Sequence, residues 1–129
     1  MNLWQIIISG IILLLLDSIY LFIFGNYFNE VVTSIQGTKI QFNLIGAIFC
    51  YIFLIGGLNY FILDANKSIL ESTRDAMLLG LVIYGVYETT NYAILSKWTP
   101  KAVILDTSWG AILFGLTALF TKLILNIKL

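Results

Sequence analysis

The sequence contains no histidine, a single cysteine and a single proline, and only 11% of its residues are charged. The absence of histidine removes the commonest general base, the usual haem ligand and the usual zinc ligand. Cys50 has no second cysteine with which to form an internal disulfide, and it stands in an apolar run where a packing role is expected. These absences exclude the common metal and thiol chemistries, so we expect no metal and no cofactor.

The charged side chains are too few to cover the surface of a soluble domain of this size. Seven basic and seven acidic residues give zero net charge, while 60% of the 129 residues are hydrophobic. Without a basic field or a cluster of lysine and arginine, neither nucleic acid nor anionic lipid is an expected partner. A lipid environment resolves the imbalance, because a bilayer accepts an apolar surface.

Four stretches are long and apolar enough to cross a bilayer as helices: residues 3–24, 42–63, 76–95 and 102–121. A crossing helix needs about 20 mainly apolar residues. Of the charged side chains, only Asp17, Glu88 and Asp106 fall inside these stretches. We therefore predict an all-α fold: an integral membrane four-helix bundle with up-down topology, formed by residues 1–129 as one domain.

The connections between the stretches carry local signals. Ser68 and Glu71 match a capping box, which predicts that the third helix begins near Ser68. Trp98-Thr99-Pro100 predicts a tight break, so the last two helices are expected to form an antiparallel hairpin. Residues 29–41 form the longest connection, which we expect to be a surface loop or a short interfacial helix.

The flanking charges favour a cytoplasmic N-terminus and C-terminus by a narrow margin. The basic residues on the inner side would be Lys67, Arg74, Lys122 and Lys128, against Lys39, Lys97 and Lys101 outside. No cleavable signal is recognised in the first stretch. An integral protein of a bacterial or organelle inner membrane is the expected localisation.

The three acids within the stretches are predicted to lie in the same half of the bilayer. Asp17 and Glu88 come late in the first and third helices, which run in one direction, and Asp106 comes early in the fourth, which runs in the other. Asn43, at the start of the second stretch, enters from the same side. We expect these residues to meet in the interior of the bundle.

Other polar and aromatic side chains follow the acids at helical spacing. In the third helix they are Tyr84, Tyr87 and Asn91, on the face of Glu88. Tyr20 follows Asp17 by three residues, and Trp109 follows Asp106 by three. The candidate polar cluster or ligand site therefore comprises Asp17, Tyr20, Asn43, Tyr84, Tyr87, Glu88, Asn91, Asp106 and Trp109.

No lysine or arginine lies within a predicted span to neutralise these acids. Carboxyl groups gathered in a low dielectric resist ionisation, so at least one is expected to be protonated, unless a cation or water keeps the charges. The cluster has two interpretations. It joins the helices by hydrogen bonds, or it marks an ion path, a proton relay or a ligand site.

Several motifs resemble a family of small predicted bacterial membrane proteins called domain of unknown function 2177. Residues 16–21 carry its Leu-Asp-x-x-aromatic-Leu run, residues 42–44 its Phe-Asn-Leu, and residues 84–91 its Tyr-Gly-x-Tyr-acid-x-Thr-Asn. Residues 98–100 and 106–110 resemble its Trp-x-Pro loop and its Asp-x-x-Trp-Gly helix. The chain departs from the family in Tyr20, where Trp is usual, and Glu88, where Asp is usual. The resemblance implies the same four-helix topology but no activity.

Three functions are compatible with these features. The first is a non-enzymatic subunit or scaffold that packs against other membrane proteins or associates with itself. The second is a proton- or cation-coupled carrier acting as an oligomer, with the three acids as binding groups. The third is an enzyme that uses a protonated acid on a lipid or isoprenoid. A cavity at the acids would favour carrier or enzyme, and a filled interior would favour the subunit.

Overall fold

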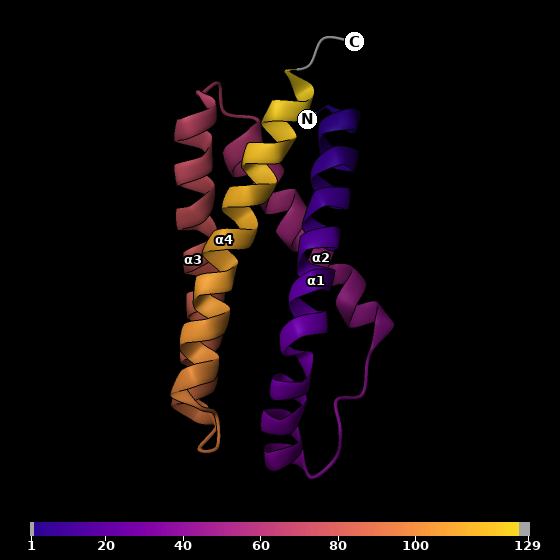
Figure 1. Ribbon diagram of the computed structural model, residues 1–129, viewed down its shortest axis with the longest axis vertical. Helices are drawn as coiled ribbons and strands as arrows, with labels where there is room; N and C mark the ends of the chain where they lie inside the picture. Colours follow the sequence, from indigo (N-terminus) through magenta and orange to yellow (C-terminus); the bar gives the residue numbers. More distant parts are fainter. Residues whose placement is uncertain (1, 127–129) are drawn as a thin grey trace.

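The computed structural model describes residues 2–126, which form four helices and contain no strand. These are α1 (Leu3–Gln36), α2 (Leu44–Leu58), α3 (Ile69–Ile94) and α4 (Pro100–Leu125), and α2 continues directly into a π-helix, η1 (Asn59–Leu63). In Figure 1 consecutive helices run in opposite directions, and the start of α1 lies at the same end as the end of α4. The predicted all-α four-helix fold is confirmed. The up-down crossing of a bilayer stays a prediction.

Each α-helix begins at a side chain that accepts a hydrogen bond from a backbone N–H of its first turn. These caps are Asn2, Asn43, Ser68 and Thr99, with acceptor distances of 2.9 to 3.1 Å. The start of α3 after Ser68 is as predicted. Pro100 follows Thr99 as the first residue of α4, where its missing N–H costs nothing, and this accounts for the break between α3 and α4.

The first helix is longer than the sequence predicts. Residues 29–36 are neither a loop nor a separate helix, because α1 continues without interruption to Gln36 and ends where Gly37 adopts a φ of 81°. At 1.5 Å per residue its 34 residues span about 50 Å, well beyond the hydrocarbon thickness of about 30 Å. The additional length packs on the loop between α3 and α4, where Val31 contacts Trp98 and Ala102.

The closest helix pair is α3 and α4, which lie side by side in Figure 1. A Cβ atom placed on Gly80 would lie 2.1 Å from the carbonyl oxygen of Gly110, and one on Gly110 would lie 2.4 Å from the ring of Tyr84. Only glycine permits this separation, so the two helices touch backbone to backbone. By contrast, α1 packs on α4, and α2 reaches the bundle mainly through α1 and η1.

The outer surface of the bundle is apolar, unlike that of a soluble bundle. Leu13, Leu58, Leu113 and Phe114 are fully buried in the centre, yet many large apolar side chains point outward, such as Phe22, which is 91% exposed. Within residues 2–126 three helices are long and apolar enough to cross a membrane: α1, α2 with η1, and α4. α3 is less apolar, because it carries polar residues towards both ends, and its crossing stays a prediction.

A π-helix turn joins α2 to the core. Asn59 is fully buried at its start, where the amide donates to the Ser9 hydroxyl at 2.9 Å and to the Ile55 carbonyl at 2.8 Å. The side-chain amide oxygen of Asn59 accepts a hydrogen bond from the Gln5 side chain at 3.0 Å. Every polar atom of this side chain therefore has a partner, and η1 is fastened to α1.

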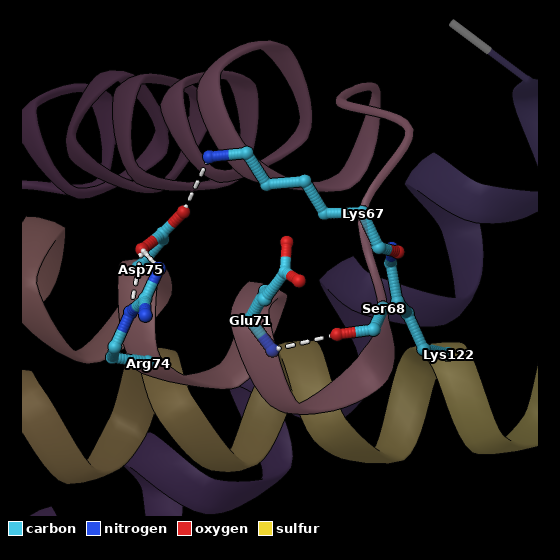
Figure 2. A network of polar contacts seen from close by, with 6 residues as sticks. All are labelled: Lys67, Ser68, Glu71, Arg74, Asp75 and Lys122. Carbon is cyan, nitrogen blue, oxygen red and sulfur yellow. Dashed lines mark hydrogen bonds and ion pairs between the residues drawn. The ribbon is translucent and has the colours of Figure 1, made fainter.

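Charged residues gather where the chain passes from η1 to α3. Figure 2 shows Lys67 and Arg74 approaching the two oxygens of Asp75, at 2.7 and 3.1 Å. The hydrogen bond from Lys67, followed by that from Arg74, holds the pKa of Asp75 below its usual value. Lys122 donates to the carbonyl oxygen of Lys67 at 2.8 Å and so joins the end of α4 to this group. Lys128, also predicted on this side, lies outside the described residues.

Candidate functional site

The three acids of the predicted cluster meet in one half of the bundle. The Asp106 carboxylate on α4 accepts a hydrogen bond from the Tyr20 hydroxyl on α1 at 3.1 Å. Asp106 and Glu88 on α3 line the same cavity. Tyr20, Glu88 and Asp106 therefore lie together where α1, α3 and α4 meet.

Asp17 joins three helices. One carboxylate oxygen accepts from the Tyr51 hydroxyl of α2 at 2.5 Å, and the other accepts from the Trp109 indole of α4 at 3.0 Å. Only 8% of Asp17 is exposed. A buried acid thus receives a donor on each oxygen, which offsets the cost of removing it from water.

Glu88 is held by the loop that follows its own helix. The indole N–H of Trp98 donates to the Glu88 carboxyl at 2.8 Å, and both side chains are buried. Trp98 is therefore an interior residue of the protein. Its ring closes the end of the α3–α4 hairpin over the acid.

A stacked aromatic pair connects the two groups of hydrogen bonds. The rings of Tyr20 and Trp109 lie 4.7 Å apart and within 5° of parallel. Tyr20 donates to Asp106 and Trp109 donates to Asp17, so the stack joins both acids across α1 and α4. We call the resulting set the acid network: Asp17, Tyr20, Tyr51, Glu88, Trp98, Asp106 and Trp109.

Two of the cavities reach carboxyl groups of the acid network. One of about 350 Å³ lies between α2 and α3, lined by Cys50, Leu54, Ile83, Tyr84, Tyr87 and Asp106. The other, of about 190 Å³, lies against α1 and the α3–α4 loop, and its lining includes Tyr20, Tyr87, Glu88, Trp98 and Asp106. Asp106 and Tyr87 line both. We call the two together the lateral cleft.

A packed apolar layer lies on the far side of the acids. Leu13, Leu58, Leu113 and Phe114 have no exposed surface and belong to one continuous core. Leu13 precedes Asp17 on α1 by one turn, and Leu113 follows Asp106 on α4 by two turns. This layer, the apolar plug, separates the acid network from the opposite end of the bundle.

The sequence placed nine residues in the cluster, and the structure brings most of them to one place. Asp17, Tyr20, Glu88, Asp106 and Trp109 belong to the acid network, and Tyr84 and Tyr87 line the lateral cleft. Asn43 lies elsewhere: it is exposed and caps α2 by accepting from the Gly46 N–H at 3.0 Å. Asn91 lies one turn beyond Glu88. Within residues 2–126 no hydrogen bond joins either asparagine to an acid.

Two residues of the acid network were not predicted for it, Tyr51 and Trp98. Tyr51 shares a face of α2 with the buried Leu54 and Leu58 at helical spacing, and this was the available signal. Trp98 offered no such signal, because its direction depends on how the loop folds back. Within residues 2–126 no three acidic or cysteine side chains are arranged to hold a metal ion. The network is instead a set of carboxyl groups surrounded by neutral donors.

Comparison with known proteins places the chain among predicted membrane proteins. No curated protein and no solved structure gave a significant match. A family model described as a predicted membrane protein, DUF2177, matches residues 2–123, which cover every residue of the acid network. The chain therefore belongs to the DUF2177 family of predicted membrane proteins.

Proposed function

We propose that this protein binds an amphiphilic molecule of the lipid phase in the lateral cleft, with the polar group of that molecule against Asp106. The observation that carries the proposal is a largely apolar cavity of about 350 Å³ that ends on a carboxyl group. Ligand sites commonly combine apolar walls with a few polar groups that fix orientation.

Access from the lipid supports this function. Cys50 is exposed on α2 and Tyr87 is 60% exposed on α3, and both line the cleft. Since these side chains face the outside of the bundle in its apolar part, an acyl or prenyl chain reaches the acids without crossing water. The entrance would be lateral, between α2 and α3.

The polar group of the ligand should donate hydrogen bonds. Among the described residues no lysine or arginine lines either cavity of the cleft, whereas Asp106 lines both and Glu88 lines one. Carboxyl oxygens favour an amine or a hydroxyl and disfavour a phosphate or a carboxylate. We therefore expect a long-chain amine or alcohol to bind and an anionic lipid to be excluded.

The apolar plug favours ligand binding over ion transport as the function of a single chain. A proton or cation path needs polar groups or water from one face to the other, and the fully buried Leu13, Leu113 and Phe114 interrupt it. An ion-coupled carrier therefore stays an alternative that requires an oligomer or a second conformation.

A non-enzymatic role is part of the proposal. Among the described residues the acid network contains no nucleophile beside a base, and its acids accept hydrogen bonds from tyrosine or tryptophan. Action on a bound lipid by a protonated Glu88 or Asp106 is the enzymatic alternative. Assembly with other membrane subunits or with a second copy stays a prediction, as do the bacterial or organelle inner membrane and the orientation.

The test is photo-crosslinking in lipid nanodiscs with dodecylamine that carries a diazirine in its chain. We expect the label on peptides of α2 and α3 that line the cleft, and competition by dodecanol. The methyl ether of dodecanol, which cannot donate a hydrogen bond, should not compete. A label spread evenly over the outward faces of all four helices would contradict the proposal.

Two variants on α2 make the test specific. Cys50→Trp places a large ring in the cleft and should remove most of the cleft label. Ile52→Trp adds the same ring to an exposed position that does not line the cleft, and should leave the labelling as it is. Equal labelling of the two variants would show that the probe binds elsewhere.

A further inference from the structure

Most of α2 has little contact with the bundle. None of residues 44–53 is buried, whereas Leu54 and Leu58 at the end of the helix are. The first part of α2 also forms one wall of the lateral cleft, through Cys50. The segment that separates the cleft from lipid therefore has few buried contacts with the other helices.

A single side-chain hydrogen bond, within the described residues, ties this part of α2 to another helix. Tyr51 donates to Asp17 of α1 at 2.5 Å. Asn43, at the start of α2, bonds within its own helix, to the Gly46 N–H. The other oxygen of Asp17 accepts from Trp109, so the same carboxylate joins α2 and α4 to α1.

The other end of α2 is firmly held. Asn59 is hydrogen-bonded to Ser9 and Gln5, and η1 contacts α1, α3 and α4. Just before it, Gly56 and Gly57 stand where an added Cβ would meet nothing within 4 Å. Adjacent glycines and a π-helix turn are both places where helices bend. The chain thus places a flexible joint between a loose segment and an anchored one.

We propose that residues 44–53 form a lateral gate for the cleft, which swings about the joint at Gly56 to η1 and is latched by Tyr51 on Asp17. This inference rests on the proposed function, since the gate regulates entry to the same cleft. Opening the gate moves Cys50 away from α3 and widens the entrance from the lipid. Loss of the Tyr51–Asp17 hydrogen bond releases the latch.

The test measures the position of α2 without any ligand. Spin labels at Ile45→Cys on α2 and Ile94→Cys on α3, both highly exposed positions, report the distance across the entrance by pulsed EPR in nanodiscs. Cys50→Ser in the background removes the native thiol. In Tyr51→Phe we expect the population at the longer distance to be about twofold to tenfold larger than in the parent. This factor is the change in the equilibrium constant that the loss of one hydrogen bond produces.

Tyr60→Phe is the matched control, because it removes a hydroxyl from an exposed tyrosine of η1 and should leave the distances unchanged. A second variant keeps the test decisive if Tyr51→Phe does not fold. Gly56→Ala with Gly57→Ala stiffens the joint and should narrow the distance distribution. Distributions that superimpose on the parent in both variants would overturn the gate.

The two proposals fail in different ways. If α2 keeps one distance in every variant while dodecylamine still labels the cleft, the gate is wrong and the binding function stands. If Tyr51→Phe opens α2 but no probe labels the cleft, the joint exists and the binding function is wrong. If both hold, Tyr51→Phe should label faster than the parent.

Discussion

At the scale of single residues, two glycines decide how close α3 and α4 lie. Gly80→Ala would push a methyl group to within 2.1 Å of the Gly110 carbonyl oxygen, which cannot move aside because it is backbone. We expect the variant to unfold at lower temperature, with a loss of about 1–3 kcal/mol, the usual cost of overpacking. Thermal denaturation in mild detergent measures it.

Gly56→Ala is the control for that substitution. Nothing lies within 4 Å of the added methyl group, and alanine favours the helix more than glycine does. Its melting temperature should equal or exceed that of the parent. Equal melting temperatures for Gly80→Ala and the parent would mean that α3 and α4 are farther apart than described.

The hydrogen bond from the Trp98 indole has an effect on stability that can be measured. Trp98→Phe keeps a ring in place but removes the donor to Glu88, which is 1% exposed. A buried acceptor without its partner costs about 1–3 kcal/mol, so stability should fall by that amount. Trp4→Phe removes an indole that is 66% exposed and should have little effect in the same melting experiment.

The residues of the site were predictable where helical spacing fixes their direction. Asp17 and Tyr20 on α1, and Asp106 and Trp109 on α4, share faces that the spacing identified, and they meet in the structure. The directions of the Trp98 and Asn43 side chains were not predictable, because Trp98 follows the end of α3 and Asn43 precedes the start of α2. There the local turn decides the direction: Asn43 caps its own helix, and Trp98 folds back onto Glu88.

At the scale of elements, the length of α1 has a testable consequence. If residues 3–24 cross the membrane, the remainder of α1 stands outside the hydrocarbon together with the α3–α4 loop. In a Cys50→Ser background, Glu30→Cys should react with a membrane-impermeant maleimide in nanodiscs. Phe22→Cys, equally on the outside of the bundle but in the apolar part, should not. Equal reaction of both would place the whole of α1 in one environment.

The charged start of α3 should make stability depend on pH. Lys67 and Arg74 hold the pKa of Asp75 below its usual value, so the folded pKa is lower than that of the unfolded chain, about 3.9. The contribution of the ionised carboxylate is therefore complete above the unfolded pKa and is lost as the pH falls through the lower folded pKa.

Melting temperatures between about pH 6 and pH 2 measure this effect. We expect the parent to lose more stability than Asp75→Asn across this range, and the difference to shrink in high salt, since the pair is near the surface. A variant that loses as much stability as the parent would assign the acid sensitivity to other carboxyl groups.

The elements themselves were predictable because an apolar stretch of membrane length has few alternatives to a helix. The capping residue Ser68 and the break at Pro100 were equally local and appear as predicted. The continuation of α1 through residues 29–36 was not predictable from hydropathy. Those residues are mixed in polarity, and their helix is stabilised by packing of Val31 against Trp98 and Ala102, which are far away in sequence.

At the scale of the whole molecule, the basic residues predict an orientation. Lys67, Arg74 and Lys122 gather at the end of the bundle that we expect inside the cell (Figure 2). In intact bacteria, with Cys50→Ser, Thr38→Cys should react with an impermeant maleimide, and Asn66→Cys should react only after the cells are opened. The reverse pattern would place the N-terminus and C-terminus outside.

The close contact between Gly80 and Gly110 has a consequence for how the protein is made. Among the helices of residues 2–126, α3 alone is not apolar enough to qualify as a span, and Glu88 costs about 2.5–3.5 kcal/mol on the insertion scale. Trp98, the partner of that acid, and Gly110, the backbone contact on α4, follow α3 in the chain and leave the ribosome after it. We therefore expect α3 to wait at the insertion machinery and to enter the bilayer together with α4, as one hairpin.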